Sequence, residues 1–337
     1  MENVFDRFNR PLRDLRISLT DRCNFRCVYC MPKEIFGTPT HFMPVEEAMS
    51  RAEIVTIVGA LSRLGVRKVR LTGGEPLLRD DIVPLVADLK QIPGIEDIAV
   101  TTNGSTLTRA RAASLKEAGL SRITVSLDSL DAERFGAING VGFTPARVLK
   151  AIDNAAEAGL SPVKINAVIK RGMNEVDIVP LAEHFRFTGH TVRFIEFMDV
   201  GTSNGWELKD VVSAAEMLKM IGERWALHPV DPGYYGEVAE RYAYDDGGGE
   251  IGLIASVTQP FCRACTRARL SADGRFLLCL FAEHGINLRD LVRKGMNEED
   301  LTETVRKIWE ARDDRYSELR ASHGSGGKRL EMFQIGG

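Results

Sequence analysis

Three cysteines lie close together near the start of the chain, at Cys23, Cys27 and Cys30. Thiolates are soft ligands that suit iron-sulfur clusters or zinc. A closed structural zinc site needs a fourth ligand nearby, and no His or Cys follows before His41. A 4Fe-4S cluster held by three cysteines would keep one iron open to a small molecule. The C-x3-C-x2-C spacing therefore indicates a catalytic cluster rather than a structural metal site.

A second trio, Cys262, Cys265 and Cys279, accounts for the remaining cysteines of the chain. No fourth cysteine accompanies it, so it resembles the first trio in composition. A zinc site completed by His284 remains the alternative to a second open cluster. Because every cysteine falls into one of the two trios, metal binding explains them better than disulfides or chance burial.

Two arginines, Arg267 and Arg269, stand two residues apart on a predicted strand beside the second trio, so they share one face. Two guanidiniums on one face suit a polyphosphate, because charge-assisted hydrogen bonds contribute about 1.5–3 kcal/mol each. The strand is expected to fold back into a hairpin at 273–274. A two-residue turn would place Cys279 opposite Ala268, whereas a three-residue loop would align it with Arg267, and both registers remain open.

The composition, 44% hydrophobic and 27% charged over 337 residues, is typical of a globular protein with one large or two ordinary domains. The formal net charge of -3 gives no general attraction for nucleic acid or an anionic membrane, so an anion must be bound by a local basic cluster. No apolar run approaches the ~20 residues that span a bilayer, and the acidic start at Glu2 and Asp6 lacks a signal-peptide core. We therefore expect a cytoplasmic protein with reduced thiols.

Strands and helices alternate through the first part of the chain, which indicates a parallel α/β sheet. This part spans about 200 residues, fewer than the ~250 of a complete eightfold barrel, so we expect an incomplete (β/α)6 TIM-like barrel. A doubly wound open sheet is the alternative. The expected strands are 13–19, 68–71, 97–102, 122–127, 163–168 and 191–197. The expected helices are one opening at 44–47 and those at 82–89, 109–118, 145–158 and 176–187.

The alternation stops after Val200, which suggests a domain boundary. We expect a partial barrel over 1–200 and a small C-terminal α+β domain over 201–337 that carries the second cysteine trio. The glycine- and serine-rich stretch 322–328 should be mobile, yet the apolar stretch 332–335 before the end could dock on the protein.

Polar and glycine-rich segments follow the expected strands of the barrel. Ligands of parallel α/β folds bind beyond the carboxyl ends of the strands. The segments at these ends are the first cysteine trio, 72–76, 101–104, 126–129 and 196–198. Their agreement in position predicts one site at this end of the sheet.

The first trio has Tyr29 before its last cysteine, and Gly73-Gly74-Glu75 follows the second strand. This combination resembles the radical S-adenosylmethionine superfamily. The resemblance implies that S-adenosylmethionine chelates the open iron and is cleaved by one electron to a 5′-deoxyadenosyl radical. In that case Gly74 and its neighbours hold the amine, Ser126 the carboxylate or ribose, and Tyr29 and Met198 the adenosyl part. From the residues alone, Ser126 could be a turn serine and Met198 a core residue.

From about Arg10 to the end, the chain resembles one family of this superfamily, the GTP 3′,8-cyclases of molybdenum cofactor biosynthesis. The resemblance rests on 21–32, 70–77, 193–198, 261–270, 279–281 and the terminal 336–337. Residues 201–249 match poorly, so no role is carried over to them.

The family resemblance implies two 4Fe-4S clusters, the second with an open iron that meets the guanine of GTP. It implies that the radical takes hydrogen from C3′, and that the carbon radical attacks C8 to give 3′,8-cyclo-dihydroguanosine triphosphate. The first cysteine trio, Arg267, Arg269, Gly336 and Gly337 would be catalytic, with the two glycines inserted into the site. A frayed terminus is the alternative for the glycines. The GTP-binding residues would be Arg16, Lys68, Arg70, Thr101, Lys164, Arg193, Arg267 and Arg269.

The residues themselves support an anionic substrate at two of these positions. Lys164 and Arg193 are charges inside otherwise apolar strands. They could lie on an exposed face, but inward charges in a barrel need a partner.

The family context adds as partners a reductase or a flavodoxin or ferredoxin as electron donor, and the downstream cyclic pyranopterin monophosphate synthase. Monomer and homodimer are both open. Two other functions compete with GTP cyclisation: peptide modification by a radical enzyme with an auxiliary cluster, and nucleotide sensing by a protein with zinc and one cluster. Arg267, Arg269 and the two terminal glycines argue against the peptide enzyme.

Overall fold

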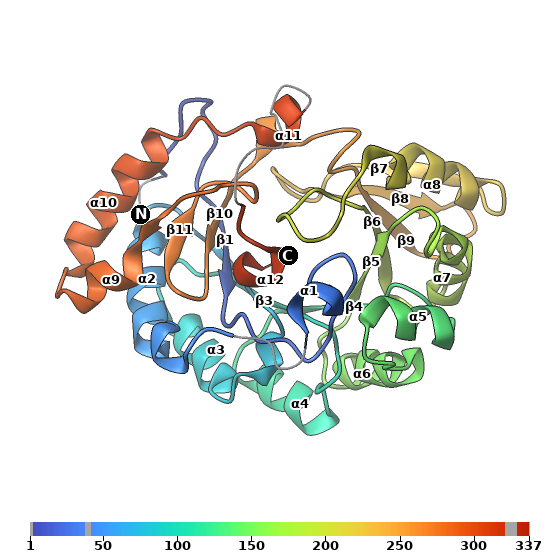
Figure 1. Cartoon of the computed structure of the whole chain (residues 1–337), viewed down its shortest axis with the longest axis horizontal. Coiled ribbons are helices and arrows are strands. Elements are labelled where there is room, and N and C mark those ends of the chain that lie inside the picture. Colours follow the sequence, from blue (N-terminus) through green and yellow to red (C-terminus); the bar gives the residue numbers. More distant parts are fainter. Residues whose placement is uncertain (1–2, 38–41, 321–328, 337) are drawn as a thin grey trace.

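The computed structural model describes residues 3–37, 42–320 and 329–336. One curved sheet runs through it, with the strand order β12-β11-β10-β1-β2-β3-β4-β5-β6-β9-β8-β7 (Figure 1). The strands are β1 Asp14–Ser18, β2 Lys68–Thr72, β3 Asp97–Thr102, β4 Arg122–Ser126, β5 Lys164–Ile169, β6 Thr191–Glu196, β7 Leu227–Val230, β8 Glu240–Tyr244, β9 Glu250–Ile254, β10 Arg267–Leu270, β11 Arg275–Leu277 and β12 Ile286–Asn287. The expected incomplete barrel of six parallel strands, β1 to β6, is confirmed.

The C-terminal part of the chain extends this barrel at both edges. β9 pairs in parallel with β6, and β10 pairs in parallel with β1. The second cysteine trio lies around β10 and β11, so the sheet brings it to the edge beside β1. Segments about 250 residues apart in sequence thus become neighbours, which sequence periodicity does not reveal.

Helices surround the outer face of the sheet, as Figure 1 shows. The helices of the described residues are α1 Lys33–Phe36, α2 Arg51–Arg63, α3 Ile82–Gln91, α4 Arg109–Glu117, α5 Ala132–Asn139, α6 Pro145–Glu157, α7 Ile178–Phe185, α8 Ala214–Gly222, α9 Leu288–Arg293, α10 Glu298–Glu310, α11 Tyr316–Leu319 and α12 Met332–Ile335. Within the described ranges, none is long and apolar enough to cross a membrane. The short α12 lies near the centre of the view, beside α1.

The helix expected to open at Pro44 begins later. Val45–Glu47 forms a separate 3-10 turn, and α2 begins at Arg51. The reason is a capping box: Ser50 accepts a hydrogen bond from the Glu53 amide, and Glu53 accepts one from the Ser50 amide. These two hydrogen bonds satisfy N–H groups at the start of α2. Pro44 has no side-chain acceptor and makes no such cap.

We expect Ser50→Ala to lower the free energy of unfolding by about 0.5–2 kcal/mol, because the α2 cap loses its acceptor. Chemical denaturation of the metal-free chain measures this loss. Ser50→Asp is the matched control, since aspartate caps about as well as serine. Equal destabilisation by both substitutions would contradict the capping role.

The strands of the barrel present a polar inner face and an apolar outer face. In β1, Leu15 and Ile17 are fully buried towards the helices, while Asp14 and Arg16 alternate with them and are partly exposed. β2, β5 and β6 show the same alternation. A barrel filled with packed side chains would instead have apolar inner positions. The polar inner face therefore indicates a cavity inside the barrel.

The hairpin beside the second trio has the longer of the two loops considered from sequence. Arg269 pairs with Leu277 and Leu270 with Phe276. Ser271 and Arg275 then flank a three-residue loop, closed by the hydrogen bond from the Ser271 amide to the Arg275 carbonyl, 3.0 Å. This register, continued towards the strand ends, aligns Cys279 with Arg267 and rules out the two-residue turn.

Candidate active site

The first cysteine trio lines a cavity at the carboxyl ends of the strands. The predicted S-adenosylmethionine contacts line the same cavity, namely Tyr29, Gly74, Ser126 and Met198. The cysteine loop is tied to α5, a helix that sequence reasoning missed. The Arg26 amide donates to the Asn139 carbonyl at 2.8 Å, and the Val28 amide to the Ile138 carbonyl at 3.0 Å.

The Gly-Gly-Glu motif supports this loop from the β2 side. A Cβ on Gly74 would overlap the backbone of Arg22, so only glycine lets the two segments lie this close. The Gly74 amide donates to the Thr20 carbonyl at 2.7 Å. Glu75 is buried and accepts from the Thr102 hydroxyl at 2.6 Å and from the Asn103 amide at 2.7 Å. The glutamate therefore fixes the motif to the end of β3.

Burial raises the pKa of the Cys23 thiol to about 12, and it also raises the pKa values of Cys27 and Cys30. Neutral thiols of this kind need a bound cation to become ligands. No three His, Cys, Asp or Glu side chains among the described residues are gathered to hold a single metal ion. Three thiols that face one cavity, with a glycine-lined wall, fit a cluster with an open position.

Asp128 lines the same cavity, although its place at a strand end was the only feature that sequence reasoning noted. Its carboxylate accepts from the Tyr29 hydroxyl at 2.8 Å and from the Val168 amide at 2.9 Å. Burial raises the pKa of Asp128 to about 6. Asp128 thus orients Tyr29, the residue expected to contact the adenosyl group.

The second cysteine trio lines another cavity. Of the predicted GTP-binding residues, all except Lys164 line it: Arg16, Lys68, Arg70, Thr101, Arg193, Arg267 and Arg269. Lys164 is on the inner face of β5 but is not part of the lining. The two cavities adjoin, because Thr101, Asn166, Ile195 and Met198 line both.

Sheet register brings the arginines of this cavity together. Arg16 on β1 pairs with Arg70 on β2 and with Arg269 on β10. Burial, reinforced by neighbouring guanidiniums, lowers the pKa of Arg16 and lowers that of Arg269 to about 9. Burial and Arg70 lower the pKa of Arg193 to about 9. Cations that are largely removed from water and repel one another favour an anionic ligand.

In the second trio, the surroundings of Cys265 and Cys279 shift their pKa values in opposite directions. Burial alone would raise the pKa of Cys265, but the guanidiniums of Arg267 and Arg312 lower it to about 6. Burial raises the pKa of Cys279 to about 11. His284 is exposed and does not line the cavity, so it does not complete a zinc site with the trio. Three thiols without that ligand fit a second open cluster.

The loop 231–239 also contributes to this cavity, through Tyr234, Gly236 and Val238. The Lys68 ammonium lies 3.6 Å from the centre of the Tyr234 ring, a cation-π contact. This loop belongs to the stretch that matched poorly, so the family resemblance could not assign it. The signal that the sequence held for this loop was its glycines and aromatics, which mark an irregular connection between two strands.

The C-terminal segment docks between the two cavities. Ile335 is fully buried, and Arg269 donates to the carbonyls of Ile335, at 3.3 Å, and Gly336. Gly336 has φ +72°, and a Cβ there would overlap Thr72. Glu331 anchors the segment through the Thr202 amide, 2.9 Å, and the Ser203 hydroxyl, 2.6 Å. Gly337 and the stretch 322–328 lie outside the described residues.

Comparison with known proteins agrees with this geometry. Residues 17–185 match the radical SAM superfamily, and residues 190–318 match the Molybdenum Cofactor Synthesis C family. The solved structure of Streptococcus suis SuiB bound to S-adenosylmethionine has a TM-score of 0.59 at 17% identity, covering 89% of this chain and 69% of that one. Native anSMEcpe with bound AdoMet and a peptide has a TM-score of 0.56 at 15% identity, covering 95% and 93%. Fold and cysteine site thus define a radical S-adenosylmethionine protein.

Curated relatives narrow this class. The chain is 52% identical to a GTP 3′,8-cyclase of Acidothermus cellulolyticus, over 96% of this chain and 91% of the relative. It is 47% identical to a GTP 3′,8-cyclase of Staphylococcus aureus over the whole of both chains. This chain belongs to the GTP 3′,8-cyclase family. Its cofactors are accordingly two 4Fe-4S clusters and S-adenosylmethionine.

Proposed function

We propose that this chain converts GTP to 3′,8-cyclo-7,8-dihydroguanosine 5′-triphosphate, the first step of molybdenum cofactor biosynthesis, in the two adjoining cavities of its barrel. One observation carries the proposal. A cysteine trio lies in each cavity, and of the two cavities only the second is lined by the cluster of arginines. A cofactor in the first cavity therefore lies beside an anionic substrate in the second.

When bound, a 4Fe-4S cluster and S-adenosylmethionine supply the radical that starts the reaction. The chain's own residues bind and orient the two small molecules. Gly74 and Ser126 receive the methionyl end, while Tyr29, held by Asp128, contacts the adenosyl part. The triphosphate is held by the arginines that line the second cavity, and the docked α12 segment excludes water from the junction.

We assign the first cavity to the partial barrel, 1–200, and the second trio and tail to a C-terminal unit, 201–337. The continuous sheet supports a fixed distance between the two units. We further propose a cytoplasmic location. All six cysteines are free, and the two cysteine trios need a reducing compartment if they are to bind clusters. A reductase, flavodoxin or ferredoxin would donate electrons, and the downstream cyclic pyranopterin monophosphate synthase would take the product.

The direct test reconstitutes the chain anaerobically, to about eight irons per chain as two 4Fe-4S clusters require. The reduced protein is then incubated with S-adenosylmethionine and either GTP or ATP. We expect 5′-deoxyadenosine and a cyclised nucleotide with GTP, and no cyclised product with ATP. Formation of 5′-deoxyadenosine that is independent of GTP, with GTP recovered unchanged, would reject the proposal.

Lys164 gives this binding a pH dependence. Burial, with help from Arg193 and Arg122, lowers the pKa of Lys164 to about 8. A nearby polyphosphate favours the protonated form, so bound GTP raises this pKa and binding takes up a proton above pH 8. We expect GTP affinity to be highest below pH 8 and to fall by up to about tenfold per pH unit above it.

The measurement is a GTP dissociation constant from about pH 7 to about 8.5, where Lys164 loses its proton before Arg193 and Arg269, whose pKa values are about 9. Lys164→Met should bind GTP more weakly and lose most of the pH dependence over this range. A Lys164→Met profile as steep as that of the unchanged chain would show that another group is responsible.

A further inference from the structure

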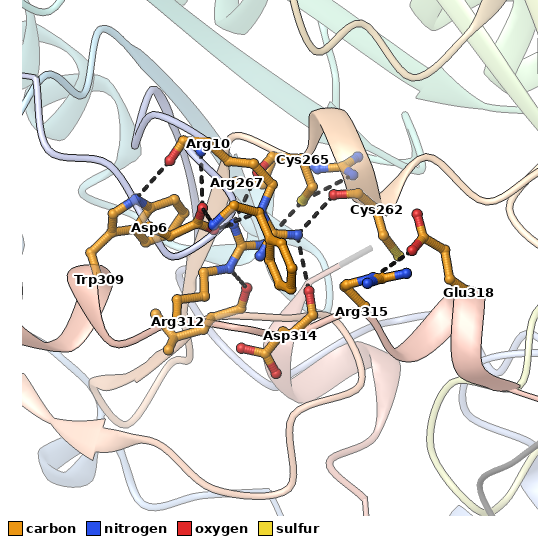
Figure 2. A network of polar contacts seen from close by, with 12 residues as sticks. Asp6, Arg10, Cys262, Cys265, Arg267, Trp309, Arg312, Asp314, Arg315 and Glu318 are labelled. Atoms are coloured by element: carbon orange, nitrogen blue, oxygen red, sulfur yellow. Dashed lines mark hydrogen bonds and ion pairs between the residues drawn. The ribbon is translucent and has the colours of Figure 1, made fainter.

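A buried charged group lies behind the second cysteine trio, away from the substrate cavity. Asp6 and Arg10 lie in the segment before β1, and Arg312 lies just after α10. All three side chains are buried. The Asp6 carboxylate accepts from Arg10 Nε at 2.6 Å and from Arg312 Nη1 at 3.1 Å (Figure 2). The Asp6 carboxylate thus joins the segment before β1 to the segment after α10. Neither the sequence motifs nor the proposed reaction uses these residues.

Arg312 makes contacts with two of the three cysteine segments at once. Its Nη1 donates to the Cys265 carbonyl at 2.9 Å, and its Nη2 lies 3.3 Å from the Cys265 sulfur. Its Nε donates to the carbonyl of Leu278, the neighbour of Cys279, at 3.1 Å. The guanidinium also stacks on Trp309, with its carbon 4.4 Å from the ring centre. These contacts in different directions fix the orientation of the guanidinium.

Arg10 holds the third cysteine segment, but through the backbone alone. Its Nη1 donates to the Cys262 carbonyl at 2.8 Å and to the Asp314 carbonyl at 2.9 Å. Trp309 donates from its indole nitrogen to the Arg10 carbonyl at 3.1 Å. Figure 2 shows the contacts of both arginines with the segment of Cys262 and Cys265. The two arginines therefore differ in one respect: Arg312 contacts a cysteine sulfur, whereas Arg10 contacts only a cysteine carbonyl.

Arg267 also donates to the Cys265 sulfur, at 3.4 Å. However, Arg267 lines the substrate cavity, where the triphosphate of GTP would compete for its guanidinium. Arg312 is not part of that lining. Its contact with the sulfur is therefore independent of substrate.

We propose that Arg312 is a positioning residue for the C-terminal cluster: it holds the segments of Cys265 and Cys279 in place, and its hydrogen bond to the Cys265 sulfur raises the reduction potential of that cluster. The proposal rests on the assignment of the second trio as cluster ligands. Its physical basis is that hydrogen bonds and positive charge at a cluster sulfur stabilise the more negative, reduced state. Asp6 orients Arg312 and remains paired with Arg10 when Arg312 is replaced.

The test is a redox titration followed by electron paramagnetic resonance, on the full-length reconstituted chain. Cys23→Ala, Cys27→Ala and Cys30→Ala are introduced together, so that only the C-terminal cluster is titrated. In this background we expect Arg312→Gln to lower the reduced-to-oxidised ratio about tenfold at a fixed potential, a shift of about 59 mV for a one-electron couple. Arg312→Lys retains the charge and should shift the potential less.

Two control variants separate tuning from a general loss of structure. Trp309→Phe removes the indole hydrogen bond to Arg10 but keeps an aromatic ring for the Arg312 guanidinium to stack on. The Arg312 contact with the sulfur is therefore retained, and the potential should not move. Arg10→Lys should reduce the iron content, with an unchanged potential for the clusters that remain.

Iron content and thermal unfolding are measured for each variant. If Arg312→Gln binds no cluster, Arg312→Lys decides the question, because it retains charge beside Asp6. An unchanged potential in the loaded Arg312 variants, or an equal shift in Trp309→Phe, would overturn the proposal. The background chain that carries Cys23→Ala, Cys27→Ala and Cys30→Ala should still bind iron. If it binds none, the assignment of the second trio as cluster ligands is overturned, and this proposal with it.

Discussion

Cys262→Ala should retain reductive cleavage of S-adenosylmethionine but lose GTP cyclisation. Cys262 lines the second cavity and not the first, so its replacement leaves the first trio, Gly74 and Ser126 in place. If the guanine meets the open iron of the second cluster, as the family resemblance implies, it would lose this anchor in Cys262→Ala. Displacement of reacting atoms by about 1 Å can cost a hundredfold in rate, so we expect cyclisation to fall at least about a hundredfold.

The two products are measured in one reaction, 5′-deoxyadenosine and the cyclised nucleotide, and their ratio reports the coupling. In the unchanged chain the two amounts should be similar, whereas Cys262→Ala should give 5′-deoxyadenosine alone. Cys23→Ala is the matched control, since loss of a ligand in the first trio should abolish both products. Normal cyclisation by Cys262→Ala would remove the second trio from the reaction.

Local patterns in the sequence predicted the elements that depend on local interactions. β3 has the bounds expected from its apolar run, and α6 begins at Pro145 as expected. The family motifs predicted the clustering of the cysteines and of most of the basic residues. Their roles in binding stay predictions.

What the sequence could not predict depends on contacts between distant segments. The pairing of Arg16 with Arg269 follows from β10 lying beside β1, and no periodicity encodes that neighbour. Arg312 looked like one of many charges after a helix, and only the fold buries it against Cys265. Tyr234 lies in a loop whose length and glycines gave no indication that it reaches Lys68.

The largest effect expected from a single binding residue is at Arg269. Its guanidinium lines the GTP cavity and donates to the carbonyls of Ile335 and Gly336. Arg269→Met should therefore lose both a phosphate contact and the docked tail. Charge-assisted hydrogen bonds contribute about 1.5–3 kcal/mol each, so we expect kcat/KM for GTP to fall by about 10²–10⁴-fold. Steady-state formation of the cyclised nucleotide measures this loss.

A double-mutant cycle tests whether Arg269 acts through the tail. Gly336→Ala should undock the tail, because its φ of +72° and its approach to Thr72 leave no room for a Cβ. If both substitutions break the same contact, their combined effect is smaller than the sum, with a coupling of about 0.5–3 kcal/mol.

Arg267→Met is the matched control for this cycle. Arg267 lines the same cavity, but its hydrogen bond is to Cys265 rather than to the tail. Its effect should therefore add to that of Gly336→Ala. Additive effects for Arg269→Met as well would mean that the tail docks without it. Coupling confined to Arg269 would instead mean that one guanidinium contacts both the substrate and the tail. GTP binding and docking of the tail would then depend on each other.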